Sequence, residues 1–273
     1  MMKTTFKLSR SAGLAGFLLS SILLHTSPVL AADSGWTLGS CEKGSGSYEW
    51  SDGDRFEGQF RNGQRNGYGV LLRGNGERYE GLYLNDRKHG QGTFLFLSGD
   101  RYEGQWAEDL FEGQGIYYFD NDDRFDGLWE AGERVRGNFH WADGNRYEGQ
   151  FRNNTRTGQG TFYWTNNNRY TGQWRDNKQH GHGTKTWANG DKYIGQWRED
   201  KMEGRGEFTF TNGNVFDGGF QDDQIHGQGT YYFANGDRYV GPWMRGKREG
   251  PGRYTDAAGR TQEMEFRNGR RID

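Results

Sequence analysis

Hydrophobic and polar positions alternate in short runs along this chain, and the whole pattern repeats every 23 residues. Residues 170–192, which read YTGQWRDNKQHGHGTKTWANGDK, form the clearest copy. The copies begin at nine aromatic residues, with one shortened step of 22 residues between the fourth and the fifth: Phe56, Tyr79, Tyr102, Phe125, Tyr147, Tyr170, Tyr193, Phe216 and Tyr239. A fixed period of this length is typical of repeat proteins, in which each unit packs against its neighbours.

The first part of the copy has the pattern of an amphipathic strand. Tyr170, Gly172 and Trp174 alternate with Thr171 and Gln173. Because successive side chains of a strand point to opposite faces, the two aromatic residues and the glycine share one face. The polar residues share the other face, so Gln173 is expected to point into solvent.

The second part of the copy predicts another strand that joins the same face. Gly181, Gly183 and Trp187 keep the spacing of two, and the pair Asn189-Gly190 that follows is a strong hairpin signal. The inward glycines are expected to leave room for large rings from the neighbouring hairpin. We therefore predict an all-β fold, an elongated single-layer antiparallel sheet of about ten β-hairpins.

The two ends of the chain differ from the repeats. Residues 1–31 combine basic residues with an apolar stretch and predict a secretory signal peptide that is cleaved near Ala31. Residues 32–55 are predicted to form an N-terminal capping half-repeat, 56–261 the nine repeats, and 262–273 a degenerate C-terminal cap. Pro242 and Pro251 lie in the ninth repeat, where prolines would block further pairing and end the array.

Two alternatives to cleavage are an uncleaved anchor helix and lipid attachment at Cys41, the only cysteine. The apolar stretch is shorter than the roughly 20 residues that span a bilayer, and polar residues separate it from Cys41. We therefore favour cleavage, which predicts that the chain is exported to the periplasm, the cell envelope or the extracellular space. A single cysteine can form no disulfide within the chain.

The charge of the chain argues against nucleic-acid binding. The sequence has 35 basic and 37 acidic residues, and removal of three basic residues with the signal peptide leaves 32 against 37. Binding to a phosphate backbone requires clustered Lys and Arg. A mildly acidic chain also has no general attraction to an anionic membrane surface.

The phrase Tyr-x-Gly-x-Trp, followed by a glycine pair and Asn-Gly-Asp, resembles the MORN repeat (membrane occupation and recognition nexus), and the resemblance covers residues 44 to 266. It implies a twisted single-layer antiparallel sheet with a groove. It also implies a role in protein assembly, scaffolding or lipid contact, and it implies no catalysis.

The residues that could bear chemistry occur at repeated positions. His180 and His182 resemble a metal-binding pair, but His89 and His226 occupy the same repeat position as His180. In four repeats a glutamate follows an outward arginine by two residues, which predicts exposed cross-strand ion pairs: Glu57, Glu80, Glu103 and Glu148. A residue that recurs in several units is unsuited to be a unique catalyst, so we expect no enzyme, no metal site and no cofactor.

The aromatic face is the remaining candidate for function. A single-layer sheet has no second layer to bury its rings, so a row of rings is a natural contact surface. The candidate contact residues are Tyr48, Trp50, Trp106, Trp129, Trp164, Tyr170, Trp174, Trp187, Trp197 and Trp243. Three hypotheses stay open: the rings only form the core, they bind a protein partner or a second copy of the chain, or they bind a lipid or a glycan.

Any homodimer is expected to be isologous and to form through the N-terminal end of the sheet, whereas the resemblance to the MORN family implies association through C-terminal repeats. The half-repeat from Gly44 to Trp50 contains no proline and little charge, so its edge strand is open to pairing with another chain. Tyr48 and Trp50 would then lie near the contact.

Overall fold

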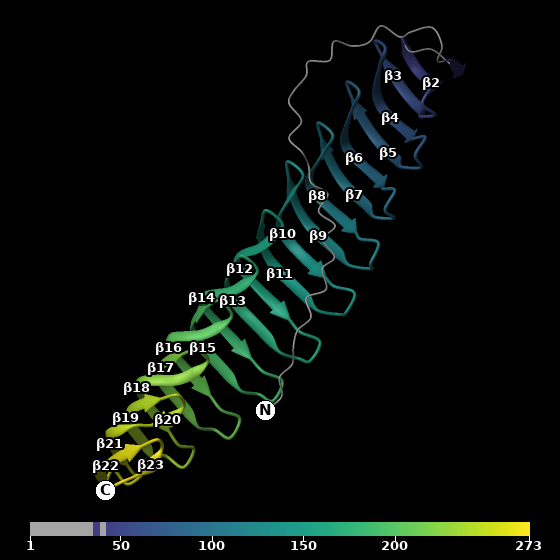
Figure 1. The fold of residues 1–273 in the computed structure, drawn as a ribbon. Helices are drawn as coiled ribbons and strands as arrows, with labels where there is room; N and C mark the ends of the chain where they lie inside the picture. The colour runs from purple at the N-terminus through teal and green to yellow at the C-terminus, as the bar shows by residue number, and fades with distance from the viewer. Residues whose placement is uncertain (1–34, 39–41) are drawn as a thin grey trace.

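The computed structural model describes residues 35–38 and 42–273; the predicted signal peptide and Cys41 lie outside these residues. In the described part the fold is all-β, without a helix, and the strands pair in chain order within one antiparallel sheet. Figure 1 shows the hairpins stacked side by side along an elongated molecule. The predicted fold class is confirmed.

The strands of the first half are β1 (Trp36–Leu38), β2 (Lys43–Glu49), β3 (Arg55–Arg61), β4 (Gln64–Leu72), β5 (Arg78–Leu84), β6 (Arg87–Leu95), β7 (Arg101–Ala107), β8 (Leu110–Tyr118), β9 (Arg124–Glu130), β10 (Glu133–His140) and β11 (Arg146–Arg152). Those of the second half are β12 (Thr155–Tyr163), β13 (Arg169–Arg175), β14 (Lys178–Thr186), β15 (Lys192–Arg198), β16 (Lys201–Thr209), β17 (Val215–Gln221), β18 (Gln224–Tyr232), β19 (Arg238–Met244), β20 (Lys247–Arg248), β21 (Gly250–Thr255), β22 (Thr261–Arg267) and β23 (Arg270–Arg271).

The two connections of each repeat have different turn types. Within the repeat, Asp176 and Asn177 both have positive φ, 50° and 66°, which gives a tight two-residue hairpin turn. Between repeats, only Gly190 has positive φ, 93°, and the Trp187 N–H donates to the Asp191 carbonyl oxygen at 2.9 Å across a longer turn. The Asn-Gly pair therefore lies in a turn between two antiparallel strands, as predicted. The tighter, two-residue turn is the one at Asp176 and Asn177 within the repeat.

Each hairpin is bent by a β-bulge beside a pair of glycines. Gly172 pairs with Gly183, but the next residue, Gln173, pairs with His180, so two residues of β14 have no opposite partner in β13. The Gln173 side chain is exposed, as predicted, and its Oε1 accepts a hydrogen bond from the backbone N–H of His182 at 2.9 Å. It therefore stabilises the bulge as well as facing solvent.

The paired glycines carry a tyrosine ring from their own hairpin. A Cβ added at Gly183 would lie 2.3 Å from the Tyr170 hydroxyl oxygen, and one added at Gly172 would lie 2.5 Å from the Gly183 Cα. The expectation that neighbouring hairpins supply these rings is thus wrong, because Tyr170 lies over residues that are its own neighbours in β13 and β14. The neighbouring hairpin instead supplies Trp197, whose Nε1 donates to the Gly183 carbonyl oxygen at 3.2 Å.

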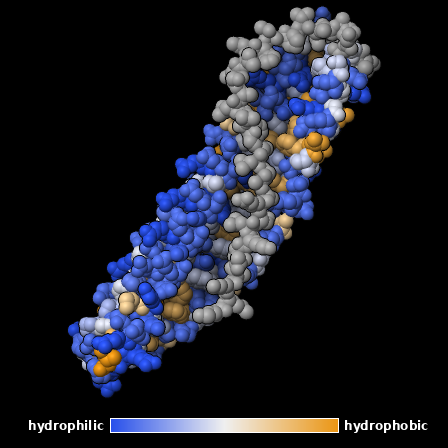
Figure 2. All heavy atoms as spheres, in the orientation of Figure 1, coloured by the Kyte–Doolittle hydropathy of each residue, from blue (hydrophilic) through white to orange (hydrophobic). Residues whose placement is uncertain are grey.

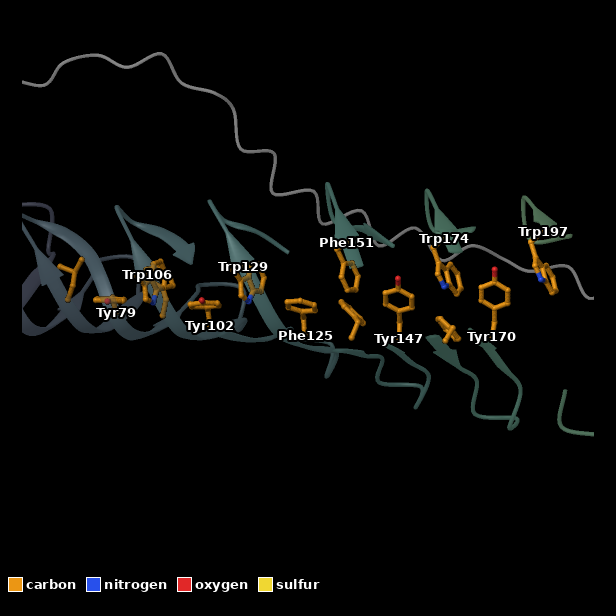
Figure 3. Close-up of a cluster of buried hydrophobic side chains, with 14 of the residues drawn as sticks. Tyr79, Tyr102, Trp106, Phe125, Trp129, Tyr147, Phe151, Tyr170, Trp174 and Trp197 are labelled. Carbon is orange, nitrogen blue, oxygen red and sulfur yellow. The ribbon is translucent and has the colours of Figure 1, made fainter. Parts of the chain in front are cut away.

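The core is one continuous row of alternating rings. Tyr170 is fully buried and makes edge-to-face contacts with Trp174 of its own strand and Trp197 of the next repeat, both at 5.2 Å between ring centroids. Figure 3 shows this row running from Tyr79 to Trp197 with strand segments on either side of the rings. The bent sheet therefore buries its own aromatic face without a second layer.

Both ends of the sheet extend further than the sequence pattern predicts. At the N-terminal end, β1 pairs with β2, with Trp36 opposite Tyr48, so β2 is covered along this part of its edge. At the C-terminal end, Pro251 lies in β21, and β22 and β23 continue the sheet beyond it. The expectation that the prolines end the array is wrong, because β21 still pairs with β22 through residues on both sides of Pro251.

The aromatic groove as candidate binding site

The predicted contact residues divide into buried and partly exposed rings. Six are at most 5% exposed and belong to the core row: Tyr48, Trp106, Trp129, Tyr170, Trp174 and Trp197. Four are partly buried: Trp50, Trp164, Trp187 and Trp243. Only some of the predicted residues are therefore accessible to a ligand, because most of these rings cover one another.

The partly exposed rings form a second row, which we call the rim row. Its members lie two residues after an inward position of the second strand, next to the turn between repeats: Trp50, Phe96, Phe119, Trp141, Trp164, Trp187, Phe210 and Phe233. Each packs against at least one ring of the inward face; Trp164, for example, lies 4.5 Å from Phe162 between centroids. Only Trp50, Trp164 and Trp187 are among the contact residues predicted from the sequence. The other rim-row residues occupy the same position of the repeat.

Cationic side chains lie among the rings, and sequence reasoning missed them. We call the surface that these cations share with the rim row the groove, and its cations are Arg65, Lys88, Arg134, Arg156, Lys185 and Arg248, all partly buried. Arg156, for instance, has its guanidinium carbon 4.7 Å from the Trp174 centroid and 5.0 Å from the Phe162 centroid. Five of the six are the second residue of the second strand in their repeat. Comparing this position across the repeats would therefore have revealed them in the sequence. Such contacts attract because the ring face is electronegative.

Near the N-terminal end the groove cations are paired with carboxylates. Arg65 Nε lies 3.2 Å from Asp86 Oδ1, and Lys88 Nζ lies 4.0 Å from Asp109 Oδ1. Each aspartate is in the two-residue turn of the next repeat and also accepts the backbone N–H of the cation, at 2.8 Å for Arg65. These first two cations are thus neutralised within the protein.

In the middle of the array the same turn position holds asparagine. Arg134 Nε donates to Asn154 Oδ1 at 2.9 Å, and Arg156 Nε donates to Asn177 Oδ1 at 3.4 Å. The hydrogen bonds resemble those of Arg65 and Asp86, but an amide carries no charge. Within the described residues, neither Arg134 nor Arg156 has a carboxylate oxygen within 4.0 Å.

The next repeat carries its cation at another place. Gln179 occupies the position of Arg156, and Lys185 stands where the neighbouring repeats have Phe162 and Phe208. Lys185 Nζ lies 5.3 Å from the centroids of Trp164 and Trp187, and no hydrogen bond or ion pair joins it to any residue that the structure describes. The Gln179 side chain is 4% exposed, and its Oε1 has no donor.

Burial shifts the pKa values of Arg134, Arg156 and Lys185. Desolvation lowers the pKa of Arg134 to about 10 and also lowers the pKa values of Arg156 and Lys185. The charged form of each side chain therefore has lost water without gaining a carboxylate. An anionic group placed in this part of the groove would stabilise all three charges.

The other predicted chemistry has a structural explanation. The glutamates pair with arginines of the same strand, as in Arg101 and Glu103 at 3.3 Å, so the predicted ion pairs exist but do not cross between strands. In residues 35–38 and 42–273, no group of three or more His, Cys, Asp or Glu side chains is arranged to hold a metal ion. The same ranges contain no helix of sufficient length and apolarity to cross a membrane. Figure 2 shows a largely hydrophilic surface on the viewed face.

The solved structures to which the chain shows a likeness include two TCP domains. The TCP10 domain of Danio rerio CPAP, in complex with a peptide of STIL, is 10% identical and covers 85% of this chain and 99% of its own, with a TM-score of 0.42. The TCP domain of Drosophila melanogaster SAS-4, in complex with a proline-rich motif of Ana2, is 14% identical and covers 57% of this chain and 85% of its own, with a TM-score of 0.39. No curated protein sequence matches this one.

The MORN repeat profile matches the chain ten times in succession. The matched ranges are 43–55, 56–78, 79–101, 102–124, 125–146, 147–169, 170–192, 193–215, 216–238 and 239–259. Nine of the ten ranges begin at the aromatic residues that start the repeats in the sequence pattern. The profile therefore places the repeat boundaries where the periodicity does.

Proposed function

The chain belongs to the MORN repeat family, and on that premise we propose that it is a non-catalytic scaffold that binds a protein partner along the aromatic groove. The observation that carries the proposal is the rim row, whose rings are only partly buried although the core row beneath them is closed. Aromatic residues and arginine are enriched in the energetically dominant parts of protein interfaces. The groove offers both types of side chain in a regular array.

The experiment is a pull-down from the organism that makes the protein, with Trp164→Ala and Trp187→Ala combined in one variant. Both rings lie at the rim, so their loss should remove the partner while the core row keeps the fold, which a thermal melt checks. Tyr232→Ala is the matched control, because Tyr232 is 44% exposed and alternates with the inward Tyr231. Recovery of the same partner by the double variant would refute the proposal.

The second candidate function is binding of a lipid or a glycan by the same rings. It is favoured by Trp141, Trp164 and Trp187, which occupy the rim in three successive repeats and could stack on sugar rings or enter a lipid interface. Co-sedimentation of the protein with liposomes and with insoluble polysaccharides, repeated with the double variant, tests it. Binding that requires Trp164 and Trp187 would favour this candidate over a protein partner.

We further propose that the protein acts after export, in the cell envelope or outside the cell, because residues 1–31 have the composition of a signal peptide. Cell fractionation and the N-terminal sequence of the mature protein test this. A mature protein that begins at Met1 in the cytoplasm would contradict it.

Self-association through the N-terminal end stays a proposal as well. Among the described residues the outermost strand at that end is β1, since β1 pairs with β2. Light scattering on the mature chain and on a deletion of residues 34–51 tests the proposal: a dimer that survives the deletion would exclude this end as the contact.

A further inference from the structure

We propose that the groove over residues 125–192 binds an extended acidic segment of the partner, with a carboxylate at every third residue. The inference rests on the proposed function and specifies the chemistry of its ligand. The residues that carry it are Arg134, Arg156 and Lys185, which we call the cation strip.

The cation strip is a run of such cations in three successive repeats; among the described residues Arg248 also has no ion pair, but the repeat before it has Ile225 at the same position. In the first two repeats the equivalent cations face Asp86 and Asp109, so an acidic ligand would compete there with carboxylates of the protein. In the strip, asparagine replaces aspartate beside Arg134 and Arg156, and the Lys185 ammonium group lies among aromatic rings with no carboxylate oxygen of the described residues within 4.0 Å. These buried charges lack a partner within the described chain, and a ligand carboxylate would provide one.

The sixth repeat, residues 170–192, supplies a second and independent observation. Gln179 and Lys185 occupy the positions of a contacting pair in the preceding repeat, where Arg156 lies over Phe162 at 5.0 Å. Here a lysine replaces the phenylalanine and a neutral glutamine replaces the arginine, and the Gln179 Oε1 is buried without a donor. Apolar packing alone does not account for a lysine at a position where both neighbouring repeats have phenylalanine.

The repeat distance selects the conformation of the ligand. Two strands of about 4.8 Å each give a rise of about 10 Å per repeat along the groove. A polyproline II segment has three residues per turn and rises about 9 Å per turn, so every third side chain would meet successive cations from the same face. A β-strand presents the same face every second residue, at about 7 Å, which does not match.

The acidic residues around the strip favour a single segment over a flat anionic surface. Exposed Asp200 and Asp223 lie close enough to act on the charge of Lys185, and exposed Glu133 acts in the same way on Arg134. A bilayer resting on the rim would meet these carboxylates as well as the cations. A narrow chain lying within the groove would meet the cations and the rings.

The probe is a fluorescent peptide of repeated Glu-Pro-Pro triplets, long enough to span the three repeats and titrated with the full-length mature protein. One comparison peptide has the same composition with its glutamates at unequal spacing, and another has glutamine in place of glutamate. We expect the regular acidic peptide to bind at least about tenfold more tightly than either. Equal affinity for the regular and the irregular acidic peptide would overturn the three-residue period.

The chain offers variants that should remove the site without harming the fold. Asn154→Asp and Asn177→Asp install the residue that Asp86 and Asp109 provide elsewhere, and Lys185→Phe installs the residue of the neighbouring repeats. The triple variant should lose at least about tenfold in affinity for the regular peptide. Arg175→Gln is the control, because it removes one positive charge from an exposed side chain of the same repeat and should leave binding unchanged.

The outcomes separate this inference from the proposed function. A natural partner that is lost with Trp164→Ala and Trp187→Ala but retained by the triple variant would leave the scaffold function standing and overturn the cation strip. Vesicles of phosphatidylserine that bind more tightly than the peptide, and that the triple variant releases, would show that the strip serves a lipid and would also overturn the inference.

Discussion

The indole of Trp197 donates a hydrogen bond from Nε1 to the carbonyl oxygen of Gly183 in the preceding repeat, at 3.2 Å. The same bond recurs between Trp106 and Gly92, Trp129 and Gly115, and Trp174 and Gly160. The glycine belongs to the bent, closely packed part of one hairpin, and the tryptophan belongs to the next. This bond therefore links consecutive repeats at the place where each hairpin bends.

Trp197→Phe should destabilise the protein by about 1 kcal/mol more than Trp243→Phe. Both changes remove a similar volume, but Trp243 Nε1 is buried without a partner, so its replacement loses no hydrogen bond. Phenylalanine is tolerated at this repeat position, as Phe151 and Phe220 show. The measurement is urea denaturation of both variants, and equal free energies of unfolding would mean that the indole bond contributes nothing.

Gly183→Ala should destabilise by about 1–3 kcal/mol, because the added methyl group would overlap the ring of Tyr170. Gly63→Asn is the control, since a Cβ at Gly63 meets nothing within 4 Å and asparagine tolerates its positive φ of 79°. Thermal melts of the two variants should differ clearly. A melting temperature of Gly183→Ala equal to that of the control would mean that the glycine pair is not needed for close packing.

Gln173→Ala should destabilise by about 0.5–1.5 kcal/mol, although its side chain is exposed, because the bulge loses the bond to the His182 N–H. Gln228→Ala, an exposed glutamine of another bulge with no side-chain hydrogen bond, should change the free energy of unfolding by less than about 0.5 kcal/mol. Chemical denaturation compares the two. The prediction fails if the two variants are equally stable.

Lys185→Phe should raise the free energy of unfolding by about 1 kcal/mol or more, since it replaces a desolvated charge by the ring that Phe162 and Phe208 supply in the adjacent repeats. The reverse change, Phe208→Lys, should destabilise the protein. Calorimetry on both variants checks the pair. A loss of stability in Lys185→Phe would show that the ammonium group is already well stabilised by the rings of Trp164, Trp187 and Trp197.

Stability should fall above about pH 10, the ordinary pKa of tyrosine. Burial raises the pKa values of the core tyrosines, including Tyr102 and Tyr170, and raises the pKa of Tyr83 to about 12. A raised pKa in the folded state means that the neutral hydroxyl is favoured there. The stabilising contribution is therefore complete below the unfolded pKa and is lost as the pH rises towards the folded pKa.

The matched variant for this pH dependence is Tyr170→Phe, which installs the residue found at Phe125. It should lose less of its unfolding free energy than the wild type between neutral and alkaline pH. Denaturation curves at several pH values provide the measurement. Identical pH slopes in the two proteins would show that Tyr170 does not contribute.

The sequence by itself determined the repeat, its phase and its inward face. A period of 23 residues with alternating Tyr170, Gly172 and Trp174 is compatible with few folds other than a stack of hairpins, and the β13 residues are buried in that alternation. Local periodicity is sufficient here because each unit repeats the same contacts with its neighbours. For the same reason the period also gave the repeat boundaries, which agree with those of the MORN profile.

Only the tertiary structure decided how the aromatic face is used. The bulge after Gly172 depends on which residues of two strands pair, and spacing within one strand does not contain that information. The bend lets the rings bury one another, which removed Trp174 and Trp197 from the accessible surface and left Trp164 and Trp187 at the rim. The spacing of residues along the chain does not show that Arg156 and Lys185 are enclosed, because the rings that surround them come from adjacent hairpins.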